Sequence, residues 1–180
     1  MDDILKERSK ALLVIVDMLK DFLDPEGKLY CGDKAREIIP FVKNLIESFK
    51  KSNNDIIFIC DSHRVNDKEF EKFPPHCVEG TEGALVIDEL NNYVNNNIIR
   101  KNRYSAFFNT EFEEFLLKGN YDEVHVVGVC TNICVLYTVE ELCNREIKTI
   151  VYKQGVQSFD ENAHKYALQQ MELVLGAKIK

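Results

Sequence analysis

The chain has 180 residues, of which 45% are hydrophobic and 29% charged, and its formal net charge is −7. This length suits one compact domain with a sizeable core, and we expect residues 1–180 to form a single domain. The acidic balance and the scattered basic residues argue against general binding to nucleic acid, which needs a basic surface to neutralise phosphates.

The N-terminal stretch MDDILKERSK is charged and polar, and it lacks the apolar segment of a signal peptide. The longest apolar run near it, ALLVIV at 11–16, is far too short to span a bilayer. We therefore expect a cytoplasmic protein without a membrane partner. Thiols stay reduced in the cytoplasm, and the six cysteines lack the paired spacing of zinc sites, so we expect them to be free.

Short apolar runs alternate along the chain with helical patterns. Apolar residues recur at helical spacing from Ile38 to Phe49, where Pro40 fits only in the first turn or at a kink. The expected strands lie at 11–18, 55–60, 97–101, 123–129 and 148–152, and further helices at 83–94, 109–118, 131–145 and 161–174. Strands that are apolar on both faces and separated by helices indicate a mostly parallel sheet, covered on both sides. The predicted fold class is therefore α/β, a three-layer αβα sandwich.

The carboxyl ends of four expected strands carry charged or reactive side chains. In chain order these are Asp17, Asp61 with His63, Lys101, and the turn that contains Cys130 and Cys134. In an open parallel sheet the ligand crevice lies beyond these ends. A single aspartate after a strand is more often a turn former or a helix cap, but the joint occurrence of these groups favours a functional site.

The stretch GVCTNICVLYT at 128–138 carries two cysteines where a strand is expected to run into a helix. Cys134 falls in the first helical turn, where the helix dipole stabilises a thiolate and lowers the thiol pKa. Asp17 could accept its proton while Lys101 stabilises the charged pair. Cys130 is expected to contribute its backbone N–H rather than its thiol. The alternatives are a buried structural cysteine at 134, a zinc pair or a redox pair.

The segment DSHRVNDKEFEKFPPHCVEGT at 61–81 carries potential metal ligands. Asp61 and His63 are two residues apart, so in extended chain their side chains face the same way. His76 follows a Pro-Pro turn that restricts the backbone. Two imidazoles and a carboxylate suit Zn, Mn or Fe(II) with an open coordination sphere. The alternative is that both histidines are exposed loop residues.

Together these motifs resemble those of the isochorismatase-like cysteine hydrolases and, within them, of the nicotinamidases (pyrazinamidases). The resemblance extends from ALLVIVDMLKDF to GVCTNICVLYT, over nearly the whole chain. The D-S-H and F-P-P-H-C elements, combined with K-x-x-Y-S-A-F, narrow it to the nicotinamidases.

The resemblance implies a catalytic triad of Asp17, Lys101 and Cys134. It also implies a cis peptide bond between Val129 and Cys130, and an oxyanion hole formed by the backbone N–H groups of Cys130 and Cys134.

The implied cofactor is one divalent metal ion, with Zn as the first expectation and Mn or Fe as alternatives. Its implied ligands are Asp61, His63, His76 and Glu69, with Glu71 as a competitor for the last position. The implied aromatic walls of the substrate pocket are Phe22, Phe73 and Tyr104. His125 and His164 match no catalytic position and are expected to be a strand-packing residue and a helix-surface residue.

The implied reaction is hydrolysis of nicotinamide to nicotinate and ammonia through a thioester, in NAD salvage, with pyrazinamide as a further substrate. The implied partner is thus a small molecule, and the sequence leaves a homo-oligomer open. The nearest rival is another hydrolase of the same family acting on a ureido, carbamoyl or vinyl-ether substrate. A non-catalytic binding module and a thiol redox protein are the rivals from other classes.

Overall fold

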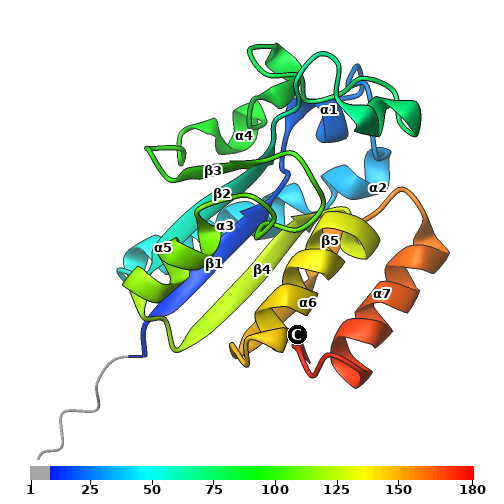
Figure 1. The fold of residues 1–180 in the computed structure, drawn as a ribbon. Helices are drawn as coiled ribbons and strands as arrows, with labels where there is room; N and C mark the ends of the chain where they lie inside the picture. Colours follow the sequence, from blue (N-terminus) through cyan, green and yellow to red (C-terminus); the bar gives the residue numbers. More distant parts are fainter. Residues whose placement is uncertain (1–8) are drawn as a thin grey trace, which may run out of the picture.

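A computed structural model describes residues 9–180 of the chain. Most of the polar N-terminal stretch, on which the expectation of a cytoplasmic protein rests, lies outside these described residues. Figure 1 shows one central sheet with helices packed on both of its faces. The strands are β1 (Ala11–Val16), β2 (Asp55–Asp61), β3 (Ile98–Lys101), β4 (Glu123–Val129), β5 (Thr149–Gln157) and β6 (Lys178–Ile179). They are all parallel, in the order β3-β2-β1-β4-β5-β6, which confirms the predicted α/β sandwich.

The helices divide between the two faces of the sheet. The longer ones are α3 (Ile39–Lys51), α5 (Phe112–Gly119), α6 (Leu136–Asn144) and α7 (Glu161–Leu173). The shorter ones are α1 (Lys20–Leu23), α2 (Asp33–Arg36), α4 (Asp88–Asn91), two 3₁₀ helices, η1 (Lys68–Glu71) and η2 (Glu82–Ala84), and a π-helical turn, η3 (Thr131–Val135). None of the helices within residues 9–180 has both the length and the apolar character needed to cross a bilayer.

Each face of the central strands contributes to a separate apolar core. Leu13 and Ile15 of β1 pack with α1 to α4, whereas Leu12 and Val14 pack with α5 to α7. All six residues of β1 are buried, as expected for a strand in the middle of a parallel sheet. This double packing fixes the carboxyl ends of β1, β2, β3 and β4 side by side.

Several elements differ from the sequence-based prediction. The prediction of one helix over 83–94 is wrong. Residues 85–87 are extended, and only the short helices η2 and α4 form in this stretch. Val86 forms an antiparallel bridge with Leu19, and Ile87 donates to the carbonyl of Met18, so this apolar run closes over the segment after β1. Strand β6 escaped prediction because two residues carry no periodic signal. Pro40 lies in the first turn of α3, as expected.

Gly128 in β4 is required by the close approach of β1. Its φ is +122°, and a Cβ atom there would lie 2.0 Å from the carbonyl oxygen of Val16. We predict that Gly128→Ala lowers the free energy of unfolding by about 3 kcal/mol or more, because the strand backbone cannot move aside. The matched control is Gly176→Ala, which has φ +76° but open space around it and should cost only about 1 kcal/mol. Equal losses for the two variants in urea unfolding would contradict the proposed clash.

Candidate active site

One pocket of about 380 Å³ lies at the carboxyl ends of the central strands. Its lining includes Asp17, Asp61, Glu69, His76, Cys130, Cys134 and the three aromatic residues Phe22, Phe73 and Tyr104. The two remaining predicted residues, Lys101 and His63, are buried behind this lining and contact it. The structure therefore brings all of the predicted site residues together.

The Lys101 ammonium lies at the centre of the charged groups. Its Nζ is 2.8 Å from Asp17 Oδ2, contacts Asp61 Oδ1, and donates to the Cys134 sulfur at 3.4 Å. Asp17 Oδ1 accepts from the backbone N–H of Asp61 at 2.8 Å. Within the described part of the chain, Asp17 Oδ2 accepts no hydrogen bond, although it faces the ammonium. This oxygen is thus paired with the ammonium and lies close to the Cys134 thiol.

Burial and charge pairing act against each other on the pKa values of this group of side chains. It raises the pKa of Asp17 to about 6, against the opposing attraction of Lys101. Burial would also raise the pKa of Asp61, but the ammonium and two neighbouring histidines hold it well below its usual range. For Lys101, burial would lower the pKa, and the two carboxylates raise it well above the usual value.

The expectation of a lowered thiol pKa at Cys134 is wrong. Burial raises the pKa of this thiol well above its usual range, and the carboxylates of Asp17 and Asp61 add to the rise, although Lys101 opposes them. A helix terminus lowers a thiol pKa most where the thiol is partly exposed to water, and Cys134 is buried. The resting thiol is therefore protonated, and chemistry at Cys134 needs a base beside it.

The turn that carries Cys134 is held by contacts from distant parts of the chain. The Val129–Cys130 peptide bond is cis, in agreement with the resemblance, and η3 follows directly. Thr131 is fully buried and its hydroxyl lies 2.8 Å from His164 Nδ1 on α7. The prediction that His164 is a helix-surface residue is therefore wrong. Sequence reasoning missed this contact because nothing local marks two residues that are 33 positions apart.

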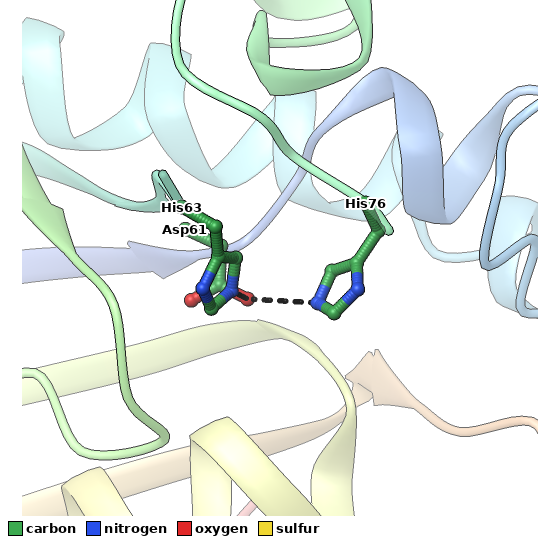
Figure 2. A group of neighbouring side chains, drawn as sticks. All are labelled: Asp61, His63 and His76. Carbon is green, nitrogen blue, oxygen red and sulfur yellow. Dashed lines mark hydrogen bonds and ion pairs between the residues drawn. The ribbon is translucent and has the colours of Figure 1, made fainter. Parts of the chain in front are cut away.

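Asp61, His63 and His76 form a buried cluster whose ligand atoms all lie within 4.8 Å of one another (Figure 2). Asp61 Oδ2 is 3.3 Å from His63 Nε2 and 3.7 Å from His76 Nε2. His76 Nδ1 donates to the carbonyl of Pro74 at 2.8 Å, which leaves its Nε2 with a lone pair directed at the cluster. The donor set fits a divalent ion such as Zn²⁺, whose protein ligands are imidazole nitrogens and carboxylate oxygens.

Asp67 and Arg103 support this cluster and were missed in the sequence. His63 Nδ1 lies 3.1 Å from Asp67 Oδ2, and Arg103 Nη1 donates to both Asp67 oxygens at 3.0 and 3.1 Å. A carboxylate on the outer nitrogen of a ligand histidine fixes the ring orientation and its tautomer. The signal was present, because Asp67 follows His63 by four residues in the same loop.

Glu69 and Glu71 occupy different environments. Glu69 is buried in η1 and lines the pocket, and burial raises the pKa of its carboxyl. Its carboxylate lies outside the group of three mutually close ligand residues. Glu71 is exposed and does not line the pocket. Of the two acidic residues, only Glu69 is placed to act in this site.

Aromatic rings line the pocket, and two of them pack against His76. Phe22 and Phe73 contact the His76 ring, with ring centroids 5.6 and 6.3 Å apart. Tyr104, which also lines the pocket, stacks on Tyr137 with ring centroids 5.8 Å apart. The three predicted walls therefore give the pocket apolar faces that suit a flat ring.

Comparisons with known proteins identify related chains over nearly the full length. The family model described as the isochorismatase domain matches residues 11–179. The uncharacterized isochorismatase family protein PncA of Bacillus subtilis (strain 168) is 34% identical, over 94% of this chain and 98% of its own. The crystal structure of nicotinamidase/pyrazinamidase PncA from Bacillus subtilis matches with a TM-score of 0.89 at 32% identity, over 94% of this chain and 98% of that one.

Two further solved structures bear on the chemistry. Pyrazinamidase of Pyrococcus horikoshii in complex with zinc has a TM-score of 0.86 at 28% identity, covering 95% of this chain and 98% of that chain. N-carbamoylsarcosine amidase from Thermoplasma acidophilum has a TM-score of 0.83 at 29% identity, covering 95% of each chain.

Proposed function

The chain belongs to the isochorismatase family of hydrolases, and on that premise we propose that it hydrolyses nicotinamide to nicotinate and ammonia through a thioester on Cys134. The observation that carries this proposal is the contact of Lys101 with three groups at once, the Asp17 and Asp61 carboxylates and the Cys134 thiol. It joins a base and a nucleophile to a metal-ligand cluster within one pocket. The likeness to nicotinamidase and pyrazinamidase structures supports the choice of substrate.

The proposed acylation uses Asp17 as the proton acceptor. Its Oδ2 takes the thiol proton as the Cys134 sulfur attacks the carboxamide carbon and forms the C–S bond. Backbone N–H groups of Cys130 and Cys134 stabilise the negative oxygen, each such donor being worth about 2.7–4 kcal/mol in other hydrolases. The C–N bond then breaks as Asp17 returns the proton to the nitrogen, and ammonia leaves.

Hydrolysis of the thioester repeats these roles with water. Asp17 takes a proton from the attacking water, the C–S bond breaks, and the proton returns to the Cys134 sulfur. Lys101 stays charged throughout, because its pKa is raised well above the usual value. It offsets the negative charge that moves between carboxylate and sulfur.

We propose that Asp61, His63 and His76 hold one divalent ion, Zn²⁺ first and Mn²⁺ or Fe²⁺ as alternatives, with Glu69 completing the site directly or through water. When bound there, the ion would supply a Lewis acid that holds the ring nitrogen of the substrate and so orients the carboxamide. Fixed orientation of this kind is worth about 7–11 kcal/mol of the barrier in favourable cases.

The aromatic walls complete the proposal for substrate binding. Phe22, Phe73 and Tyr104 would enclose the ring and exclude water from the sulfur. Pyrazinamide has the same shape and is expected to react as well. The proposed setting is NAD salvage in the cytoplasm.

An ammonia-release assay with and without a chelator tests the proposal. The purified protein should release ammonia from nicotinamide and pyrazinamide and contain a stoichiometric amount of Zn, Mn or Fe. Chelation should abolish turnover, and the same metal should restore it, because the ring loses its orienting contact when the ion is removed. If ammonia release were unchanged by the chelator, the proposal of a metal-dependent reaction would be contradicted.

The likeness to N-carbamoylsarcosine amidase favours one alternative, a hydrolase of a carbamoyl or ureido substrate. The same assay separates the two functions when N-carbamoylsarcosine is added as a substrate. Ammonia from the carbamoyl compound alone, without bound metal, would replace the proposal by this alternative.

A further inference from the structure

Cys31 and Cys130 form a buried pair of thiols that the proposed reaction does not use as thiols. Their Sγ atoms lie 3.4 Å apart although 99 residues separate them in the sequence. Both side chains line the same pocket as Cys134, and both are free. They are exposed by only 5% and 8%, so a reagent reaches them through the pocket and not from the outer surface.

We propose that this pair is an oxidation site, at which a peroxide that enters the pocket converts the two thiols to a disulfide. One sulfur attacks a peroxide oxygen, the O–O bond breaks, and the thiol proton passes to the departing hydroxide, so that a sulfenic acid forms and water leaves. The second thiol then attacks that sulfur, the S–S bond forms, and a second water leaves. The two thiols lose two electrons and two protons, and one hydrogen peroxide is reduced to two waters.

The geometry favours Cys31 over Cys134 as the partner of Cys130. The Cys134 sulfur contacts the Lys101 ammonium, whereas the Cys130 sulfur contacts Cys31. A spacing of four residues within one turn had raised the possibility of a Cys130–Cys134 redox pair, and the structure instead places a distant cysteine against Cys130.

Bond formation requires the sulfurs to approach from 3.4 Å to about 2.05 Å. Cys130 directly follows the central strand β4, which is paired on both sides. Cys31 lies near the end of the segment 24–32 between α1 and α2, which contains no helix or strand, and the Cys31 N–H donates to the carbonyl of Phe22 at 2.8 Å. Because this segment lacks the strand pairing that holds Cys130 on both sides, we infer that Cys31 moves toward Cys130 when the bond forms.

The disulfide would change the pocket at two places. The effect on activity that we expect from this change rests on the proposed function. The disulfide would fix the wall formed by residues 29–31 to the residue whose N–H belongs to the proposed oxyanion hole. Because a displacement of about 1 Å at a reacting centre costs about 100-fold in rate, we expect ammonia release to fall by about 100-fold and to recover on reduction.

The test treats the reduced, metal-loaded protein with hydrogen peroxide, blocks remaining thiols and maps the cysteine peptides by mass spectrometry. We expect a linked Cys31–Cys130 peptide that dithiothreitol separates. The Cys31→Ser variant should lose this peptide, and Cys143→Ser, which alters a half-buried thiol on α6, should retain it. Oxidation of Cys134 without any Cys31–Cys130 peptide, or a Cys130–Cys134 link, would overturn the proposal.

Peptide mapping and activity report on different claims. If the reduced protein released no ammonia, the proposed function would fail, and the linked peptide would still decide the oxidation site. If the peptide formed and the rate of the oxidised protein were unchanged, the predicted effect on the pocket would be wrong. If peroxide also caused a reversible loss of activity in the Cys31→Ser variant, the Cys31–Cys130 disulfide would not be the cause of that loss.

Discussion

Replacing Cys134 by alanine is expected to reduce ammonia release from nicotinamide by about 10⁴-fold or more, because the variant has no atom that can form the thioester. Cys130→Ala should retain most of the activity, since its backbone N–H remains in the proposed oxyanion hole. The two variants are matched in chemistry and are only four positions apart. Steady-state rates at saturating nicotinamide, with circular dichroism as a check on folding, measure the difference.

The surroundings of the two thiols are the reason for this unequal outcome. The Cys134 sulfur accepts from Lys101 at 3.4 Å and lies close to the carboxylate of Asp17. The Cys130 sulfur contacts another thiol and no charged group among its hydrogen-bond partners in residues 9–180. If Cys130→Ala were inactive and Cys134→Ala active, the nucleophile would be the other cysteine and the mechanism would need a different base.

Sequence patterns could locate the site residues that lie at the ends of strands. Asp17, Asp61 and Lys101 each follow an apolar run, and parallel strands bring such positions to one edge of a sheet. The roles of the individual residues then came from the resemblance, since spacing alone left structural alternatives for each of them.

Local sequence patterns could not predict the contacts between segments that are distant in the chain. The pairs Cys31–Cys130 and Thr131–His164 depend on how loops and α7 pack against the end of β4, which no local periodicity records. The high pKa of the Cys134 thiol has the same origin, because burial by the whole site outweighs the local effect of a helix terminus. Prediction failed where tertiary packing decided the outcome.

Replacing Lys101 by methionine is expected to remove activity and to lower the free energy of unfolding by about 3–5 kcal/mol at neutral pH. Methionine keeps the length and the apolar stem of the side chain but leaves the carboxylates of Asp17 and Asp61 buried without their counter-charge. Arg100→Met is the matched control, because it removes the same charge from the neighbouring, exposed position of β3 and should change stability by less than about 0.5 kcal/mol. Urea unfolding of the metal-free proteins compares the two.

The pH dependence of the Lys101→Met defect distinguishes lost charge pairing from lost packing. Without the ammonium, the folded-state pKa of Asp17, which burial already raises, rises further above its unfolded value, and the pKa of Asp61 rises from its low value. The folded state then binds more protons than the unfolded state, so the lost stability should return as the pH falls below the raised values. A packing defect would stay constant with pH. A Lys101→Met penalty that does not shrink on acidification would therefore contradict the role of Lys101 as the shared counter-charge of the site.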